Sequence, residues 1–214
     1  MTFQLDNDLS AVNSVLAAIG QAPVTNLNYQ NPEIALVKRL LDETTVDVQN
    51  EEWQFNTEQH KPDTPSTGTN GVREFVFPAN ALRMNVSFGQ VYRDADIIVR
   101  GDRLYNKLHH TTDVRDWSYL NSSQNYKLYF DFVWRFEFTE LPPVFQRYIT
   151  LRASQRAATQ LISNADLTKL LAEQVAMARG ACIEYDCNQG DVTFFGWPDH
   201  TVYNSYQPFR TLAR

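Results

Sequence analysis

The stretch YKLYFDFVWRFEF, from Tyr126 to Phe138, alternates between apolar and mostly polar residues. Side chains of an extended chain point alternately to its two faces, so this pattern predicts a half-buried β-strand. At about 3.3 Å per residue the strand would span roughly 40 Å, about twice an ordinary strand. A strand this long and aromatic needs cover from its own sheet or from another chain. Its apolar face holds Tyr126, Leu128, Phe130, Phe132, Trp134, Phe136 and Phe138.

The sequence before this stretch also has β character. Short strands are predicted in REFVFP and in residues 82–88. DIIVRGDRLYN predicts two strands that turn at Arg100–Arg103, where Gly101 is free to adopt a positive φ angle. The segment His60–Val72 is rich in Pro, Gly, Ser and Thr and predicts a mobile loop. Residues 54–138 are therefore expected to form an antiparallel β domain.

Helical spacing appears on both sides of this β region. A first helix is expected before Gly20 and Pro23, which end it. A second is expected from Asn31, a favourable N-cap, to about Glu51. Two more helices are expected after the β region, with Ser163 and Asn164 as candidate caps between them. Their apolar positions are Phe145, Ile149, Ala153, Ala157 and Leu161, then Leu167, Leu171, Ala178, Cys182 and Tyr185.

This order of elements predicts an α+β protein. Residues 1–53 and 139–188 are expected to form one discontinuous helical bundle, into which the β domain of residues 54–138 is inserted. Residues 189–214 contain aromatic side chains without a helical or strand period, so we expect an extended C-terminal tail that docks on a partner surface. The predicted interaction residues are Phe194, Phe195, Trp197, Tyr203, Tyr206 and Phe209 of the tail, with Phe130, Phe132 and Trp134 of the long strand.

Composition narrows the class of protein. The 214 residues suit one large or two small domains, and the net charge of -6 at pH 7 disfavours a dedicated nucleic-acid binder. An acidic surface would suit a passage through which DNA slides without sticking. The N-terminal residues MTFQLDNDLS lack the basic start and apolar core of a signal peptide, and no apolar run is long enough to span a membrane. We therefore expect a soluble protein of a reducing compartment that has no membrane contact.

Few residues have the spacing of a metal or cofactor site, and neither a metal nor a cofactor is predicted. Cys182 and Cys187 lie about 140° apart around a helix, so they favour core thiols over a metal clamp. The adjacent His109 and His110 point in different directions, and further ligands are not evident. The two remaining histidines, His60 and His200, are expected to face solvent.

Carboxylates give the one enzymatic alternative. Asp94 and Asp96 could share one face of a strand, and paired carboxylates can hydrolyse glycosidic bonds when one is protonated. The simpler interpretation is that Asp94 and Asp96 lie at a solvated loop edge. Glu51 and Glu52 are interpreted in the same way, as helix-end charges without a catalytic role. Phosphate-loop, nucleotide-binding glycine, HExxH and GxSxG patterns are absent from the sequence. The basic residues of the third helix, Arg147, Arg152 and Arg156, could meet acidic neighbours or face water.

Several segments taken together resemble the tail tubular protein A family, the head-to-tail adaptor or gatekeeper proteins of short-tailed, podovirus-type phages. The resemblance lies in LSAVNSVLAAIGQAPVTNL (residues 9–27) and in RLLDETTVDVQNEEWQFN, with its Trp-x-Phe-Asn end. It continues in ELPPVFQRYITLRASQRAA and ends near ACIEYDCNQGD. It covers both helical ends, about half of the chain, and leaves the middle of the β region unmatched.

The resemblance implies a structural protein of the virion tail, not an enzyme. The expected partners are further copies of the chain in a ring, commonly of twelve, the portal protein, the tail nozzle (tail tubular protein B) and tail fibres. DNA would pass through the centre, and the ring would be assembled in the host cytoplasm. Two alternatives stay open, a hydrolase of host surface polysaccharide acting through Asp94 and Asp96, and a small DNA-binding protein.

Overall fold

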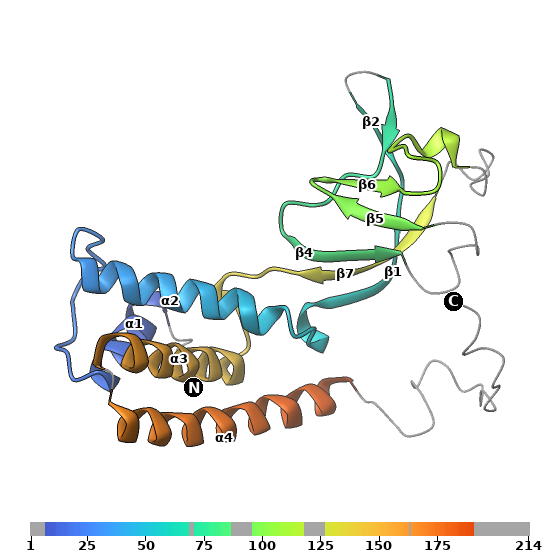
Figure 1. Cartoon of the computed structure of the whole chain (residues 1–214). Helices are drawn as coiled ribbons and strands as arrows, with labels where there is room; N and C mark the ends of the chain where they lie inside the picture. The colour runs from blue at the N-terminus through green and yellow to red at the C-terminus, as the bar shows by residue number, and fades with distance from the viewer. Residues whose placement is uncertain (1–6, 69–70, 87–95, 118–126, 163, 191–214) are drawn as a thin grey trace. The chain divides into compact units, whose positions relative to one another are not determined.

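The computed structural model describes residues 7–68, 71–86, 96–117, 127–162 and 164–190 (Figure 1). These residues divide into two units. The helical unit contains the described residues up to Phe55 and those from Phe136 onward, and the β unit contains Asn56–Arg135. Helices and antiparallel sheets both occur, so the predicted α+β class is confirmed.

Four α-helices make up most of the helical unit. They are α1 (Asp8–Ala18), α2 (Pro32–Gln49), α3 (Pro143–Ala157) and α4 (Ala165–Gly190), with a π-helical turn, η5 (Ala158–Ile162), between the last two. The Asn31 side chain accepts a hydrogen bond from the backbone N–H of Glu33 at 3.0 Å, which confirms the predicted cap of α2. Asn164 accepts from the N–H of Asp166 in the same way, at the start of α4. None of the described helices is long and apolar enough to cross a membrane.

Helix α3 is the centre of the helical unit. It packs against α1, α2 and α4, and in Figure 1 it lies between α2 and α4. Phe145, Ile149, Ala153 and Ala157 are buried at the predicted four-residue spacing, whereas Leu161, predicted to continue it, lies in η5 and is 41% exposed. The alanines let neighbouring helices approach closely. The core of the unit includes Val15, Leu41, Phe145, Ile149 and Ala153, each fully buried.

The described residues of the β unit form three small antiparallel sheets. The largest has the order β1 (Thr57–Asp63), β7 (Leu128–Trp134), β4 (Ala81–Val86). β2 (Ser66–Thr67) pairs with β3 (Arg73–Glu74), and β5 (Ile97–Arg100) pairs with β6 (Arg103–Asn106). Among the described residues, the 3₁₀ turn η2 (Val114–Asp116) belongs to the β unit, and η1 (Gln54–Asn56) lies where the chain enters it. Gly101 has φ +67° in the β5–β6 turn, which confirms the predicted hairpin.

The long strand predicted from Tyr126 to Phe138 is shorter in the structure. β7 has seven residues and occupies the middle of its sheet, between β1 and β4. After Trp134 the chain leaves the sheet, and Phe138 starts a 3₁₀ turn, η4 (Phe138–Glu140), in the core of the helical unit. The strand prediction beyond Trp134 is therefore wrong, because the Gln49 side chain and not a partner strand hydrogen-bonds the backbone of Phe136. Tyr126 lies outside the described residues.

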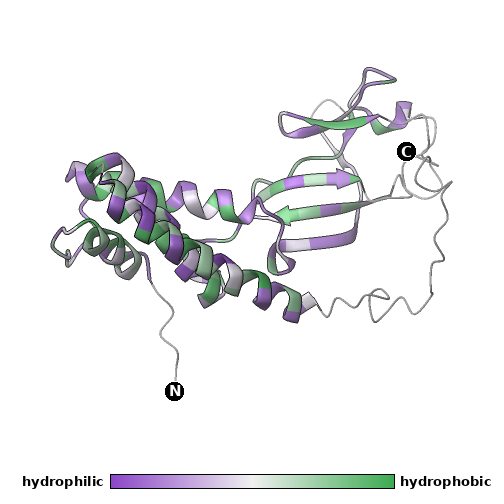
Figure 2. Cartoon of the chain, turned by 60° about the horizontal axis from the view of Figure 1, so that its bottom comes forward, coloured by the Kyte–Doolittle hydropathy of each residue, from purple (hydrophilic) through white to green (hydrophobic). Residues whose placement is uncertain are grey.

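The predicted loop from His60 to Val72 is wrong over its first part. Residues as far as Asp63 belong to β1, which pairs with β7 through a register shift near His60. The sequence TEQHKPD does not alternate because β1 is an edge strand with mostly exposed side chains. Figure 2 shows this strand as hydrophilic along its length. Backbone pairing with a hydrophobic centre strand overrides the local sequence preference here.

Candidate functional site

The aromatic residues of β7 were predicted to form an interaction surface. Phe130 and Phe132 are 0% and 2% exposed within the chain itself. The Phe130 ring contacts Phe75 edge-on, with 5.1 Å between ring centroids. The Trp134 ring stacks on Phe132, and its indole N–H donates to Glu58 at 2.8 Å. Phe130 and Phe132 are thus core residues of the β unit, and of the three only Trp134 is partly exposed.

The tail residues predicted to bind a partner lie outside the described part of the chain. They are Phe194, Phe195, Trp197, Tyr203, Tyr206 and Phe209. Their role as contacts therefore stays a prediction.

Two of the three basic residues predicted to form a face on α3 meet acidic groups within the helical unit. Arg152 lies 2.9 Å from Glu51, and Arg156 lies 2.5 Å from Asp47. Both acids lie at or just beyond the end of α2. These ion pairs tie α3 to α2, so Arg152 and Arg156 have a structural role in this chain.

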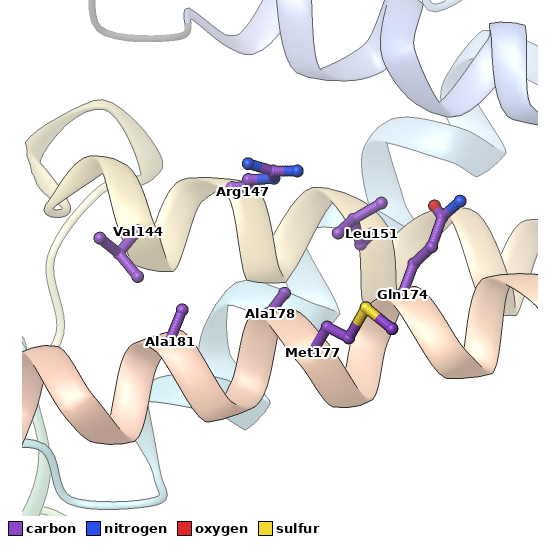
Figure 3. A pocket seen from close by; sticks show the side chains of 7 residues that line it. All are labelled: Val144, Arg147, Leu151, Gln174, Met177, Ala178 and Ala181. Atoms are coloured by element: carbon purple, nitrogen blue, oxygen red, sulfur yellow. The ribbon is translucent and has the colours of Figure 1, made fainter.

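The third of these residues, Arg147, has a different setting. It lies on the rim of a groove of about 390 Å³ between α3 and α4. The groove is lined by Val144, Arg147 and Leu151 from α3, and by Gln174, Met177, Ala178 and Ala181 from α4. Figure 3 shows Val144 and Ala181 facing one another across the two helices. Because the α4 side is lined partly by alanines, short side chains leave the space unfilled.

Helix α4 also carries exposed apolar side chains, both on the groove side and on other sides of the helix. The side chain of Met177 is 76% exposed, and those of Leu170 and Ile183 are 59% and 46% exposed. Figure 2 shows hydrophobic residues at several positions around and along this helix. Large apolar side chains on a helix surface next to a groove are typical of a site where another protein segment packs.

Comparison with known protein families identifies the class to which the chain belongs. The family model described as "Tube: Tail tubular protein" matches residues 9–192, which is most of the chain. The chain belongs to the tail tubular protein family. It is thus a structural component of a phage tail. A search of curated proteins gives no match.

Possible catalytic groups of this tail tubular protein do not come together in the described residues. Asp94 lies outside them, and Asp96 is exposed with its carboxylate 3.0 Å from the Lys107 ammonium. His109 and His110 are exposed residues after β6, and the backbone N–H of His60 donates to Asp131. His200 falls in the undescribed C-terminal residues. Across the ranges that the structure describes, no three His, Cys, Asp or Glu side chains are grouped as a metal site.

The two cysteines of the tail tubular protein are free thiols in different settings. Cys182 is fully buried, and burial raises the pKa of its thiol to about 12. Its Sγ lies 3.6 Å from the carbonyl oxygen of Val144, which it approaches as a donor. Cys187 is exposed. The interpretation of Cys182 as a core thiol is confirmed by its burial, whereas the same prediction for Cys187 is wrong, since that residue is exposed.

The groove was not predicted from the sequence. The sequence did contain a signal for it. A helix with one core-facing stripe has apolar residues on one side, whereas α4 has them on more than one side. Leu170 and Met177 are seven residues apart, on a face separate from the buried Leu171 and Cys182. What the sequence could not supply is which helix lies next to this face.

Proposed function

We propose that this protein is the adaptor of a short-tailed phage virion, a ring that joins the portal to the tail nozzle. The groove between α3 and α4, with the exposed Met177 beside it, is the observation that supports this proposal. Apolar surface of this kind remains after the subunit has folded and suits contact with another protein chain. The site has no cluster of acid–base groups that would suit turnover of a small substrate.

The proposal includes the expected assembly. Copies of the chain, twelve by the family resemblance, form a closed ring after synthesis in the host cytoplasm. The ring contacts the portal on one side and the nozzle, tail tubular protein B, on the other, with tail fibres near that second junction. DNA passes through the centre, where a net charge of -6 per chain disfavours sticking. Each subunit needs two different surfaces, because contacts in a cyclic ring are head-to-tail.

The proposal also assigns parts of the chain to roles. The bundle of residues 1–53 and 139–188 and the inserted domain of residues 54–138 are proposed as the two domains of the adaptor. Residues 189–214 are proposed as a docking segment that binds the portal or a groove of a neighbouring subunit. Its aromatic side chains offer burial worth roughly 25 cal/mol per Å² of apolar surface.

Binding to purified portal rings tests the adaptor role. The full-length protein is expected to co-sediment with portal rings at a fixed ratio of copies, measured by mass. Removal of residues 191–214 leaves every described element in place and is expected to weaken that binding. Failure of the full-length protein to bind portal rings would contradict the adaptor role. Unchanged binding after truncation would contradict only the role given to the C-terminal segment.

A further inference from the structure

The groove between α3 and α4 is open to a ligand in the isolated chain. On the α4 side, Gln174, Met177 and Ala181 are exposed, so the described residues do not cover this edge. On the α3 side, Val144 and Leu151 are only partly buried. The space of about 390 Å³ is large enough for one or two aromatic side chains. A protein segment that fills the groove would therefore come from outside the described fold.

We propose that this groove binds residues 191–214 of a neighbouring copy of the same chain. The inference rests on the proposed function, in which copies of the protein assemble side by side. It gives the C-terminal segment a specific receptor site, formed by α3 and α4 of the next subunit.

The chemistry of the groove matches the composition of this segment. The thioether of Met177 and the guanidinium of Arg147 are groups that pack favourably against aromatic rings. Arg147 makes no hydrogen bond or ion pair within the described residues, in contrast to the paired Arg152 and Arg156. The sequence DVTFFGW, which begins at Asp191, supplies three aromatic residues directly after the end of α4. The groove, with the Arg147 guanidinium and the exposed Met177 thioether, is thus suited to receive these aromatic side chains.

The direction of α4 favours a neighbouring copy as the source of the segment. Ala181 is the last residue of α4 in the groove, and the helix continues to Gly190, about 14 Å further at 1.5 Å per residue. Phe194 and Phe195 of the same chain therefore follow the far end of the helix, and the chain would have to reverse within a few residues for these two rings to reach the groove. Residues 191–214 can span at most about 80 Å when extended, whereas α4 is about 39 Å long. The extended segment is therefore longer than α4 and can extend beyond its own helix.

This contact would make the interface between copies directional. Each subunit gives its C-terminal segment to one neighbour and receives the segment of the other, so the two surfaces are different. Such a head-to-tail contact closes into a ring when its rotation fits a whole number of copies. The exposed Met177 side chain of α4 would then be covered only in the assembled state.

Photo-cross-linking of the full-length protein tests the proposal. A benzophenone amino acid replaces Trp197, and equal amounts of ¹⁴N- and ¹⁵N-labelled protein are mixed, alone and with purified portal rings. After irradiation, cross-linked peptides are identified by mass spectrometry. The expected products join the segment to residues 144–151 or 174–181, and about half of them pair a light with a heavy chain. Absence of groove products from both samples, or products that pair only chains of the same label, would overturn the proposal.

A pair of variants tests whether the groove itself is the receptor. Met177→Glu places a charge at the apolar opening and is expected to reduce groove products at least about tenfold, because the carboxylate must be desolvated for the segment to bind. Ile183→Glu is the matched control, since Ile183 is exposed on the same helix and does not line the groove. Equal yields from the two variants would overturn the assignment of the groove. Portal binding is measured separately by co-sedimentation, so failure of this inference and failure of the adaptor role give different results.

Discussion

At the scale of single residues, Glu51 has the most connected side chain at the end of α2. Its carboxylate accepts hydrogen bonds from Arg152 of α3 at 2.9 Å and from Arg179 of α4 at 3.1 Å. The bond to Glu51 raises the pKa of the Arg179 guanidinium, which remains charged at all ordinary pH values. One carboxylate thus links three helices that are distant in the sequence.

Glu51→Gln should therefore lower the free energy of unfolding of the helical unit. We expect a loss of about 0.5–1 kcal/mol, because the groups are partly exposed and solvent screens their attraction. The loss should shrink at about 1 M salt, where the screening length falls to about 3 Å. Urea unfolding followed by far-UV circular dichroism measures both effects. Glu43→Gln is the control, because the Arg39–Glu43 pair on α2 is mostly exposed and should contribute almost nothing.

At the scale of elements, the end of β7 shows how a side chain can replace a strand. The Gln49 side chain, fully buried, donates to the carbonyl of Phe136 at 3.0 Å and accepts from its N–H at 2.7 Å. Two residues further along the chain, the carbonyl of Phe138 accepts a hydrogen bond at 3.0 Å from the side-chain amide of Gln146 on α3. The backbone that leaves the sheet thus stays hydrogen-bonded without a further partner strand, as a buried backbone requires.

The Gln49 contact gives a prediction for this element. Gln49→Leu keeps a side chain of similar size but leaves the N–H and C=O of Phe136 without this partner. We expect a cost of about 2–4 kcal/mol in the free energy of unfolding, because each buried unpaired group costs about 1–3 kcal/mol. Urea unfolding measures the cost. Gln155→Leu on α3 is the control, since that side chain is only partly buried and should change stability by less than about 0.5 kcal/mol. A neutral Gln49→Leu would show that water replaces the amide.

The same element explains what could be predicted from the sequence and what could not. Alternation correctly identified Leu128, Phe130 and Phe132 as the buried face of a strand, because that pattern follows from local geometry. Alternation continues through Phe136 and Phe138 after the strand has ended, because Phe138 is buried in a different core and Phe136 packs against that core. The pattern reports burial and not the partner that provides it. The α3–α4 groove was missed for the same reason, since it depends on which helices meet.

At the scale of the whole molecule, the described residues contain two separate hydrophobic cores. The core of the helical unit surrounds Phe145, and the core of the β unit surrounds Phe130. Both rings are completely buried. Aromatic neighbours contact each of them, Trp53 with 4.9 Å between centroids in the first core and Phe75 with 5.1 Å in the second. If the two units unfold independently, one core can lose its packing while the other stays folded.

Matched substitutions in the two cores test that independence. Phe130→Ala and Phe145→Ala remove the same group from equally buried sites, and each should cost about 3–5 kcal/mol within its own unit. Hydrogen exchange with mass spectrometry should show faster exchange of β1, β4 and β7 in the first variant, with α1 to α4 unchanged. The second variant should show the reverse. If either substitution speeds exchange in both units equally, the two cores fold as one cooperative system. The chain would then lack the separable domains that the adaptor proposal gives it, since opening one core would open the other.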